Sequence, residues 1–233
     1  MKVDKRKKYI MVLDVETTNN NMEKGAPNDG LVYDIGFVVA DKKGNVYAKR
    51  SFAIKEIFDW TELMSTAYYK NKLPKYYERL ANGQMEKVTI WQARKRIKTA
   101  MEYFNITEVY AYNANFDYTT LNNTVRYLSG SACRWFFPYG TQICDIWHIA
   151  CQVLGTQKTF QWENARNENG NLITNAERMF AYLSQDFDFE EEHTGLADAL
   201  VETQILARCL RTHKSINKKI NRACWRIPQQ AVA

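Results

Sequence analysis

The order of apolar segments along the chain limits the possible folds more than any other feature of the sequence. Short apolar runs typical of buried strands span residues 9–14, 33–40 and 46–52, and residues 41–44 form a turn between the last two. Further along, helical and strand-like patterns alternate. Strands that come first and then alternate with helices predict an α/β fold with a mixed sheet.

Patterns in the middle of the chain complete the predicted sheet. A helix interrupted at Pro74 is expected over residues 60–82, and a second helix over residues 89–105. Residues 109–112 and 142–144 are predicted strands. The expected sheet therefore has five strands.

Further helices are predicted in the second half. One covers residues 115–128 and ends at Gly130, and another begins after Asp145, which is placed to cap it. A capping-box sequence at residues 174–177 starts the next helix. The last helix has an apolar stripe that should pack on the sheet. The stripe consists of Leu196, Ala199, Leu200, Thr203, Leu206, Ala207 and Leu210.

Apolar runs and cysteines in the sequence indicate the cellular compartment that we expect. The chain has no run of about eighteen apolar residues and no apolar secretory stretch near its basic N-terminus. Its five cysteines include no C-x-x-C pair, so they suggest neither a disulfide framework nor a structural zinc site. We therefore expect a cytoplasmic protein with reduced thiols and no membrane partner.

Positive charge is concentrated near the C-terminus. Seven lysines and arginines lie between Arg208 and Arg226 without an intervening Asp or Glu, in a chain whose formal net charge is +6. Such a segment either neutralises the phosphates of a polyanion or is a solvated tail, and both interpretations stay open. We expect one main domain over residues 1–212 and a basic C-terminal extension over residues 213–233.

Two carboxylates end the first predicted strand. Asp14 and Glu16 are separated by one residue, so both side chains point to the same face and can converge on one cation. Mg²⁺ and Mn²⁺ bind through carboxylates, water and substrate phosphate, and a cation between two carboxylates removes their repulsion. A solvent-facing strand end explains the same pair, so this motif alone is a weak signal.

Two further acids lie in the first turns of predicted helices. Asp117 follows the strand of residues 109–112, and Asp198 begins the last helix but lies off its apolar stripe. A helix macrodipole favours an acid at its N-terminus, which explains both residues without a metal. His193 precedes Asp198 by five residues.

Together, these segments resemble a known enzyme family. D-x-E-T-T at residues 14–18, N-A-N-F-D at residues 113–117 and H-T-G-L-A-D at residues 193–198 follow the order of the motifs of the DEDDh 3'-to-5' exonucleases. The resemblance extends from Tyr9 to Leu210. It implies a ribonuclease-H-like fold, in which a mixed five-stranded sheet is flanked by helices.

The resemblance also implies roles for single residues. Asp14, Glu16 and Asp198 would bind one divalent cation, and Asp14 and Asp117 would bind a second, with Mg²⁺ or Mn²⁺ as the metal. His193 would be the general base that deprotonates the attacking water, a task that suits imidazole near neutral pH.

Candidate substrate-binding residues are Thr17, Asn113 and Phe116. The backbone of Thr17 is expected to contact the terminal nucleotide. The side-chain amide of Asn113 is expected to brace the second motif, although a hydrogen bond to the backbone at the strand end explains this residue equally well. Tyrosines interleaved with lysines at residues 68–70 and 75–77 are candidates for stacking on bases, although helix packing explains them equally well.

The chain departs from the family pattern at the substrate-binding end. Many members have His-Asn where this chain has Tyr112-Asn113, and Gly-Leu where it has Asn19-Asn20. The family's leucine wedges against the terminal base, and Met22 is the candidate replacement.

Two acidic features lie close to the third motif. The acidic run at residues 186–192 is interpreted as an exposed loop whose negative charge would raise the pKa of His193. Glu202 lies one helical turn beyond Asp198, and we expect it to face solvent, with a contact to the site as the alternative.

These features predict a metal-dependent 3'-to-5' exonuclease that releases nucleoside 5'-monophosphates from single-stranded DNA, in DNA replication or repair. Expected partners are a nucleic acid with a free 3' end and two divalent cations, and a polymerase or another replication protein is a further candidate. An exoribonuclease of the same family is one alternative. Another is a non-catalytic, polymerase-associated subunit that binds nucleic acid, whereas the H-x4-D spacing disfavours an endonuclease or integrase.

Overall fold

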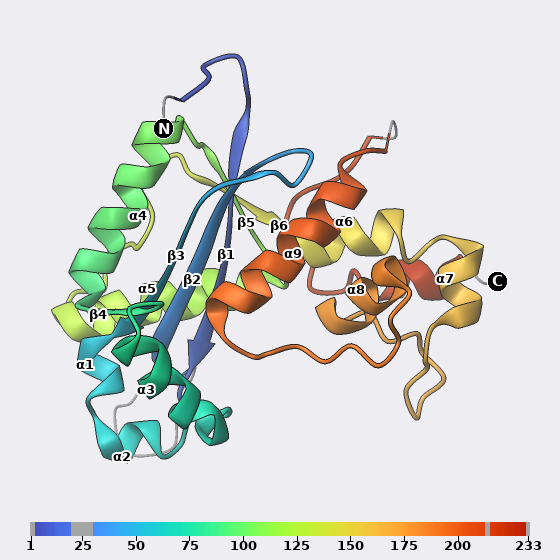
Figure 1. Ribbon diagram of the computed structural model, residues 1–233. Helices are drawn as coiled ribbons and strands as arrows, with labels where there is room; N and C mark the ends of the chain where they lie inside the picture. The colour runs from blue at the N-terminus through green and yellow to red at the C-terminus, as the bar shows by residue number, and fades with distance from the viewer. Residues whose placement is uncertain (1–2, 20–29, 213–214, 232–233) are drawn as a thin grey trace.

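A mixed six-stranded sheet forms the centre of the molecule (Figure 1). The computed structural model describes residues 3–19, 30–212 and 215–231. The strands lie in the order β4-β3-β2-β1-β5-β6. They are β1 (Tyr9–Thr17), β2 (Val32–Asp41), β3 (Val46–Ile54), β4 (Glu86–Val88), β5 (Glu108–Ala111) and β6 (Gln142–Asp145). The first three strands pair antiparallel, whereas β4, β5 and β6 each run parallel to their neighbours.

The expected α/β class is confirmed, but the expected number of strands is wrong by one. The missed strand is β4, which has three residues and pairs with β3 at the edge of the sheet. A strand this short shows no alternation of apolar and polar residues, so its sequence carries no strand signal.

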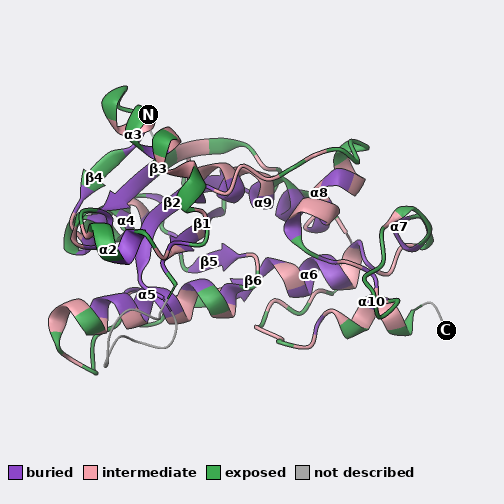
Figure 2. Cartoon of the chain, turned by 90° about the horizontal axis from the view of Figure 1, so that it is seen from below, coloured by how far each residue is buried: buried purple, intermediate pink, exposed green. Residues whose placement is uncertain are grey.

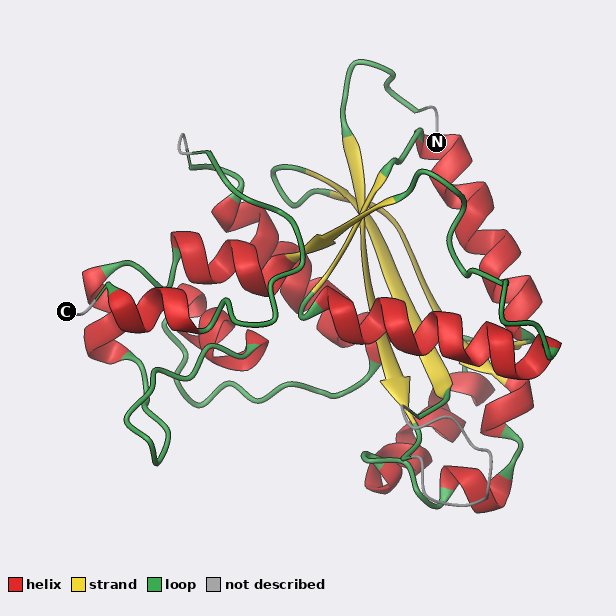
Figure 3. Cartoon of the chain, turned by 180° about the vertical axis from the view of Figure 1, so that it is seen from behind, coloured by secondary structure: helices red, strands yellow, loops and turns green. Residues whose placement is uncertain are grey.

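Helices cover both faces of the sheet. The helices are α1 (Lys55–Phe58), α2 (Thr61–Met64), the 3₁₀ turn η1 (Lys70–Lys72), α3 (Leu73–Ala81), α4 (Ile90–Phe104), α5 (Ala114–Ser129), α6 (Ile146–Val153), α7 (Lys158–Glu163), α8 (Ala176–Ser184), α9 (Gly195–Cys209) and α10 (Arg226–Gln230). Helix α9 crosses the front of the sheet in Figure 1, and α5 crosses the opposite face in Figure 3. Among the described helices, none has both the length and the apolar character needed to cross a membrane.

Local sequence signals account for most helix boundaries. Thr89, the predicted start of the second helix, caps α4 in a capping box with Gln92, and Asp145 caps α6 as predicted. The predicted capping box before α8 is shifted by one residue, because Asn175 is the residue that accepts the backbone N–H of Arg178. The helix expected over residues 60–82 is divided into short pieces.

Pro74 lies in the first turn of α3 rather than in a break within a helix. Proline is tolerated there because the first-turn N–H groups have no helical partner.

Alternate residues of β1 belong to two separate cores. Tyr9, Met11, Leu13 and Val15 pack with residues of α4 and α5, and Ile10 and Val12 pack with residues of α6 and α9. Figure 2 shows β1, β2 and β5 as buried along most of their length. Burying each large apolar side chain stabilises the fold by about 1.5–3 kcal/mol. The same alternation turns the two acids at the end of β1 toward α9.

Two glycines allow α9 to lie directly on the sheet. Gly36 pairs with Asp14 across β1 and β2. A Cβ atom on Gly36 would lie 2.0 Å from the backbone nitrogen of Leu196, and one on Gly195 would lie 2.6 Å from the nitrogen of Gly36. The absence of side chains at these positions brings the first turn of α9 next to the acidic end of β1.

The basic segment beyond α9 returns to the body of the molecule. The carbonyl oxygen of Lys218 accepts the backbone N–H of Asp145 at 2.8 Å, and its ammonium group contacts Glu108 at 3.2 Å. Cys224 and Pro228 are buried. Residues 215–231 therefore pack along β6 and α6.

Candidate active site

A cavity of about 450 Å³ lies where the end of β1 meets the first turns of α5 and α9. All five predicted catalytic residues line it, together with two of the predicted substrate-binding residues. These are Asp14, Glu16, Asp117, His193 and Asp198, with Thr17 and Phe116. Segments far apart in the sequence thus contribute to one site.

Three carboxylates converge at this point. One oxygen from each of Asp14, Glu16 and Asp198 lies within 4.8 Å of the others. The Oδ1 atom of Asp198 is buried and has no hydrogen-bond partner among the described residues. Hard divalent cations take carboxylate oxygens as ligands, so this group has the donor set of a Mg²⁺ or Mn²⁺ site.

Asp117 approaches the same point from the opposite face of the sheet. Its side chain is buried, and its Oδ1 atom accepts the backbone N–H of Val15 at 3.2 Å. Helix α5 begins after Asn113, whose φ of 59° lies in the left-handed region that asparagine tolerates. This turn directs the first turn of α5, and with it Asp117, toward β1.

Burial raises the pKa of every carboxyl group in the cluster. Desolvation, with neighbouring negative charge, raises the pKa of Glu16 to about 9 and the pKa of Asp198 to about 8. Desolvation also raises the pKa of Asp117 to about 8, and the pKa of Asp14 lies well above its ordinary value. Charged carboxylates in this position need a cation close by, because burial and mutual repulsion both oppose ionisation.

A fifth carboxyl group belongs to the same cluster. Glu202 lines the cavity and is only 2% exposed, so the expected solvent-facing role is wrong. Its Oε2 atom has no partner among the described residues, and burial raises the pKa of this carboxyl group well above its ordinary value. Its spacing of four residues from Asp198 puts both on one face of α9, and only the packing shows that this face meets β1.

His193 closes the cavity from the segment that precedes α9. Its φ is 53°, and its ring stacks on Tyr69 with centroids 4.1 Å apart. Burial lowers the pKa of His193, and the positive charge of Lys72 lowers it further. The expected rise in this pKa is therefore wrong.

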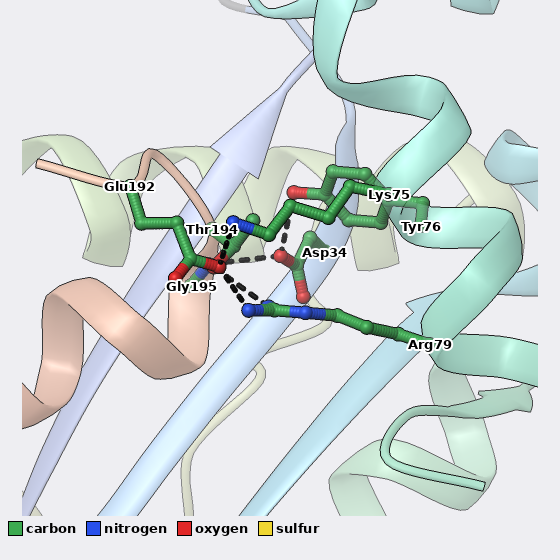
Figure 4. Close-up of polar contacts among 7 residues, drawn as sticks. All are labelled: Asp34, Lys75, Tyr76, Arg79, Glu192, Thr194 and Gly195. Atoms are coloured by element: carbon green, nitrogen blue, oxygen red, sulfur yellow. Dashed lines mark hydrogen bonds and ion pairs between the residues drawn. The ribbon is translucent and has the colours of Figure 1, made fainter. Parts of the chain in front are cut away.

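Glu190 of the acidic run and Glu177 act to raise the pKa of His193, but burial and Lys72 outweigh them. Another acid of the run is bound by helix α3. Glu192 forms ion pairs with Lys75, at 2.8 Å, and with Arg79 (Figure 4). Arg79 also donates to the hydroxyl oxygen of Thr194 at 2.9 Å. Both neighbours of His193 in the chain are thus bonded to α3.

Asp34 connects Gly195, the residue after Thr194, to helix α3. This carboxylate is fully buried and accepts the backbone N–H of Gly195 and the hydroxyl of Tyr76, each at 2.8 Å (Figure 4). Burial raises the pKa of Asp34 to about 6, although both hydrogen bonds oppose the rise. No sequence motif marks Asp34, since its partners come from segments distant along the chain.

The substrate-binding end of the cavity carries exposed rings. Phe116 is 42% exposed and Tyr68 is 75% exposed, and both line the cavity. Tyr76 is fully buried, so packing explains this tyrosine and base stacking does not. Asn113 makes no side-chain hydrogen bond to any described residue, and its observed contribution is the left-handed turn before α5.

The structure describes some of the residues that depart from the family pattern, but not all of them. Tyr112 lines the cavity, and its hydroxyl donates to the carbonyl oxygen of Thr174. Asn19 lines the cavity. Asn20 and the proposed wedge Met22 lie outside the described residues.

Solved structures of nucleases have a fold similar to that of this chain. The nuclease domain of 3'hExo, a DEDDh family member, bound to rAMP, matches 93% of this chain and 98% of its own, with a TM-score of 0.60 and 15% identity. E. coli exonuclease I in complex with a dT13 oligonucleotide matches 86% of this chain, with a TM-score of 0.53 and 14% identity. Its zinc-bound complex with single-stranded DNA matches 84%, with a TM-score of 0.52 and 14% identity.

This chain covers 40% and 39% of those two exonuclease I chains. No family model and no curated protein sequence matches it. The structural likeness identifies the fold as that of the DEDDh exonucleases.

Proposed function

We propose that this chain, which has the fold of the DEDDh exonucleases, is a metal-dependent 3'-to-5' exonuclease. The observation that carries the proposal is the convergence of Asp14, Glu16, Asp117 and Asp198 with His193 on one cavity. A non-catalytic subunit with this fold has no need to keep this set of buried, mutually repelling carboxylates.

The residues present fit a divalent metal. Three carboxylate oxygens lie within 4.8 Å of one another, and the buried Oδ1 of Asp198 and Oε2 of Glu202 have no described protein partner. Unpaired buried carboxylates are costly, and a bound cation would remove that cost. We propose that Asp14, Glu16 and Asp198 hold one Mg²⁺ or Mn²⁺ and that Asp14 and Asp117 hold a second. Two such cations would stabilise the attacking and leaving oxygens of a phosphodiester displacement.

His193 is proposed as the general base. Its lowered pKa keeps the imidazole neutral near pH 7, the form that accepts a proton from the attacking water. Phe116 and Tyr68 would flank the terminal base, and the backbone of Thr17 would contact the terminal nucleotide. The products would be nucleoside 5'-monophosphates.

Single-stranded DNA is the proposed substrate, and RNA is the alternative. The relatives support both, because exonuclease I was solved with single-stranded DNA and the 3'hExo domain with rAMP. Purified protein should be incubated with 5'-labelled DNA and RNA of one sequence, with Mg²⁺ or with EDTA. A ladder that shortens from the 3' end only with Mg²⁺ supports the proposal. The substrate that is degraded faster shows whether the protein prefers deoxyribose or ribose.

Two controls separate this activity from related ones. A circular form of the preferred substrate should survive conditions that consume the linear form, and rapid cutting of the circle would indicate an endonuclease. Asp14→Asn and Asp198→Asn should each nearly abolish the ladder while the protein stays folded. Near-normal turnover by either variant would remove that residue from the metal site.

A further inference from the structure

The segment that carries His193 is held by one helix through contacts on both sides of the histidine. Glu192 pairs with Lys75 and Arg79, and Thr194 accepts a hydrogen bond from Arg79. Figure 4 shows both basic side chains reaching from α3 to this segment. On the far side of Thr194, Asp34 links Gly195 to Tyr76 of α3.

The ring of His193 itself contacts the residue that precedes η1 and α3. Tyr69 lies parallel to the imidazole, at an interplanar angle of 8°. Tyr69 also lines the cavity. One stretch of the chain, residues 69–79, therefore contacts His193 and the residues on both sides of it.

Fold stability alone does not account for these contacts. The Lys75 and Glu192 side chains are 42% and 33% exposed, and ion pairs this exposed contribute little to stability. Holding long basic side chains in one geometry also costs conformational entropy. The segment they hold has a histidine in the left-handed region, a conformation that persists only where its surroundings enforce it.

We infer that Arg79 and Lys75 are positioning residues for His193. By binding Glu192 and Thr194, they hold the imidazole beside the carboxylate cluster in the orientation set by Tyr69. Neither basic residue needs to touch the substrate. This inference rests on the proposed function only for its catalytic consequence, because the position of the imidazole can be measured without turnover.

Loss of the contacts should affect the chemical step more than substrate binding. A general base works only within hydrogen-bond reach of its proton, and a displacement of about 1 Å lowers rates on the order of 100-fold. Arg79→Gln should therefore lower kcat by about 10- to 100-fold, with KM changed less than about threefold. Lys75→Met should lower kcat less, because Arg79 keeps its contacts to both Glu192 and Thr194.

A double-mutant cycle tests whether Arg79 acts through His193. In a His193→Ala background, Arg79→Gln should cause no further loss of kcat, because the group that Arg79 positions is already absent. Two losses that multiply would show an independent role for Arg79 and would overturn the inference. Arg96→Gln is the matched control, since Arg96 pairs with Glu86 on the surface away from the cavity and should leave kcat unchanged.

The position of the imidazole gives a readout that does not depend on activity. Stacking on Tyr69 shields the ring protons of His193, so Arg79→Gln should shift the His193 ring resonance in a ¹H–¹³C spectrum, and Arg96→Gln should not. An unshifted resonance would overturn the inference even if the wild-type protein is an active nuclease.

The spectrum and the nuclease assay together separate the inference from the proposed function. If Arg79→Gln shifts the resonance but the wild-type protein has no nuclease activity, the contact is supported and the proposed function is rejected. If Arg79→Gln does not fold, Glu192→Gln removes the same ion pairs at a more exposed position and should give the same shift.

Discussion

At the scale of single residues, buried carboxyl groups govern how the metal-free protein responds to pH. The pKa values of Glu16, Asp117 and Asp198 are raised to about 9, 8 and 8. An acid with a raised pKa binds its proton more tightly in the folded state than in the unfolded state. It therefore stabilises the fold fully below its unfolded pKa of about 4, and that contribution is lost as the pH rises through the folded pKa.

The metal-free protein should consequently become less stable between about pH 6 and pH 9. Thermal unfolding in EDTA should show a lower Tm at the higher pH. Saturating Mg²⁺ should reduce the difference, because a cation favours the ionised carboxylates and binds only the folded state. Equal Tm values in EDTA at both pH values would contradict the raised pKa values.

Glu202 should add to this repulsion in the metal-free state. Glu202→Gln replaces one buried acid of the cluster with a neutral amide of nearly the same shape. The variant should have a higher Tm than the wild type in EDTA near pH 9, and a smaller gain in Tm on addition of Mg²⁺. The test is a comparison of both proteins at matched pH. A Tm equal to that of the wild type in EDTA would place the Glu202 charge outside the cluster.

His193 should control the acid limb of the rate profile. Burial and Lys72 lower its pKa, so the neutral, proton-accepting form should persist below the usual value of about 6.5. In the parent protein, kcat at saturating Mg²⁺ should start to fall only below that pH. His193→Ala should lose about 10²- to 10⁴-fold in kcat, and this limb should disappear. An unchanged profile with a loss below about threefold would exclude His193 from the chemistry.

At the scale of elements, the site depends on how closely α9 lies on the sheet. Gly36 faces the first turn of α9 without a side chain, next to Asp14 in the sheet register. Asp198 and Glu202 are carried by this helix, and His193 by the segment just before it. Any displacement of α9 moves these groups away from Asp14, Glu16 and Asp117 together.

Gly36→Ala should therefore lower activity more than a typical core substitution. The added methyl would overlap the α9 backbone and should cost about 1–3 kcal/mol of the free energy of unfolding. The shift of α9 should lower kcat on the order of 100-fold. Urea unfolding and kcat are the measurements. Ser51→Ala is the control, because Ser51 pairs with Gly36, is buried, and has no described partner for its hydroxyl. Equal kcat in both variants would show that this contact does not position α9.

At the scale of the whole molecule, the basic C-terminal segment comes to the rim of the cavity. Arg222 donates to the side chain of Asn115 at 2.9 Å, and Asn115 precedes Phe116 of the cavity lining. Lys219 and Arg226 are exposed on the same segment. This arrangement suits contact with the phosphates of a strand whose 3' end occupies the cavity.

Replacing Lys219, Arg222 and Arg226 by glutamine should weaken substrate binding and its dependence on salt. Each lost phosphate contact on a single strand should reduce the slope of log K against log salt by about 0.7. KM measured at several salt concentrations gives this slope, and kcat should change little. Substitution is preferable to truncation because Cys224 and Pro228 are buried. The control variant replaces three exposed lysines elsewhere, Lys42, Lys43 and Lys98, by glutamine. If the slope of log K against log salt is the same for both variants, the C-terminal segment is a solvated tail.

The sequence by itself determined the fold class and gave the candidate site residues that line one cavity. Apolar periodicity is a local property, so it predicts β1, α4 and α9 without knowledge of their neighbours. Alternation along β1 predicts that Asp14 and Glu16 share a face, and the three motifs bring His193, Asp117 and Asp198 into the same family pattern. Local cap chemistry likewise predicts the starts of α4 and α6.

Only the tertiary structure decided which contacts hold the candidate site residues in place. Asp34, Arg79 and Glu202 acquire their roles through contacts with segments that are remote in sequence, and no local pattern distinguishes them from ordinary surface residues. The pKa of His193 falls rather than rises because burial and Lys72 outweigh the acidic run beside it. Burial and long-range charge depend on the packing of the whole chain, and for that reason a sequence pattern predicts which groups can react but not what holds them in place.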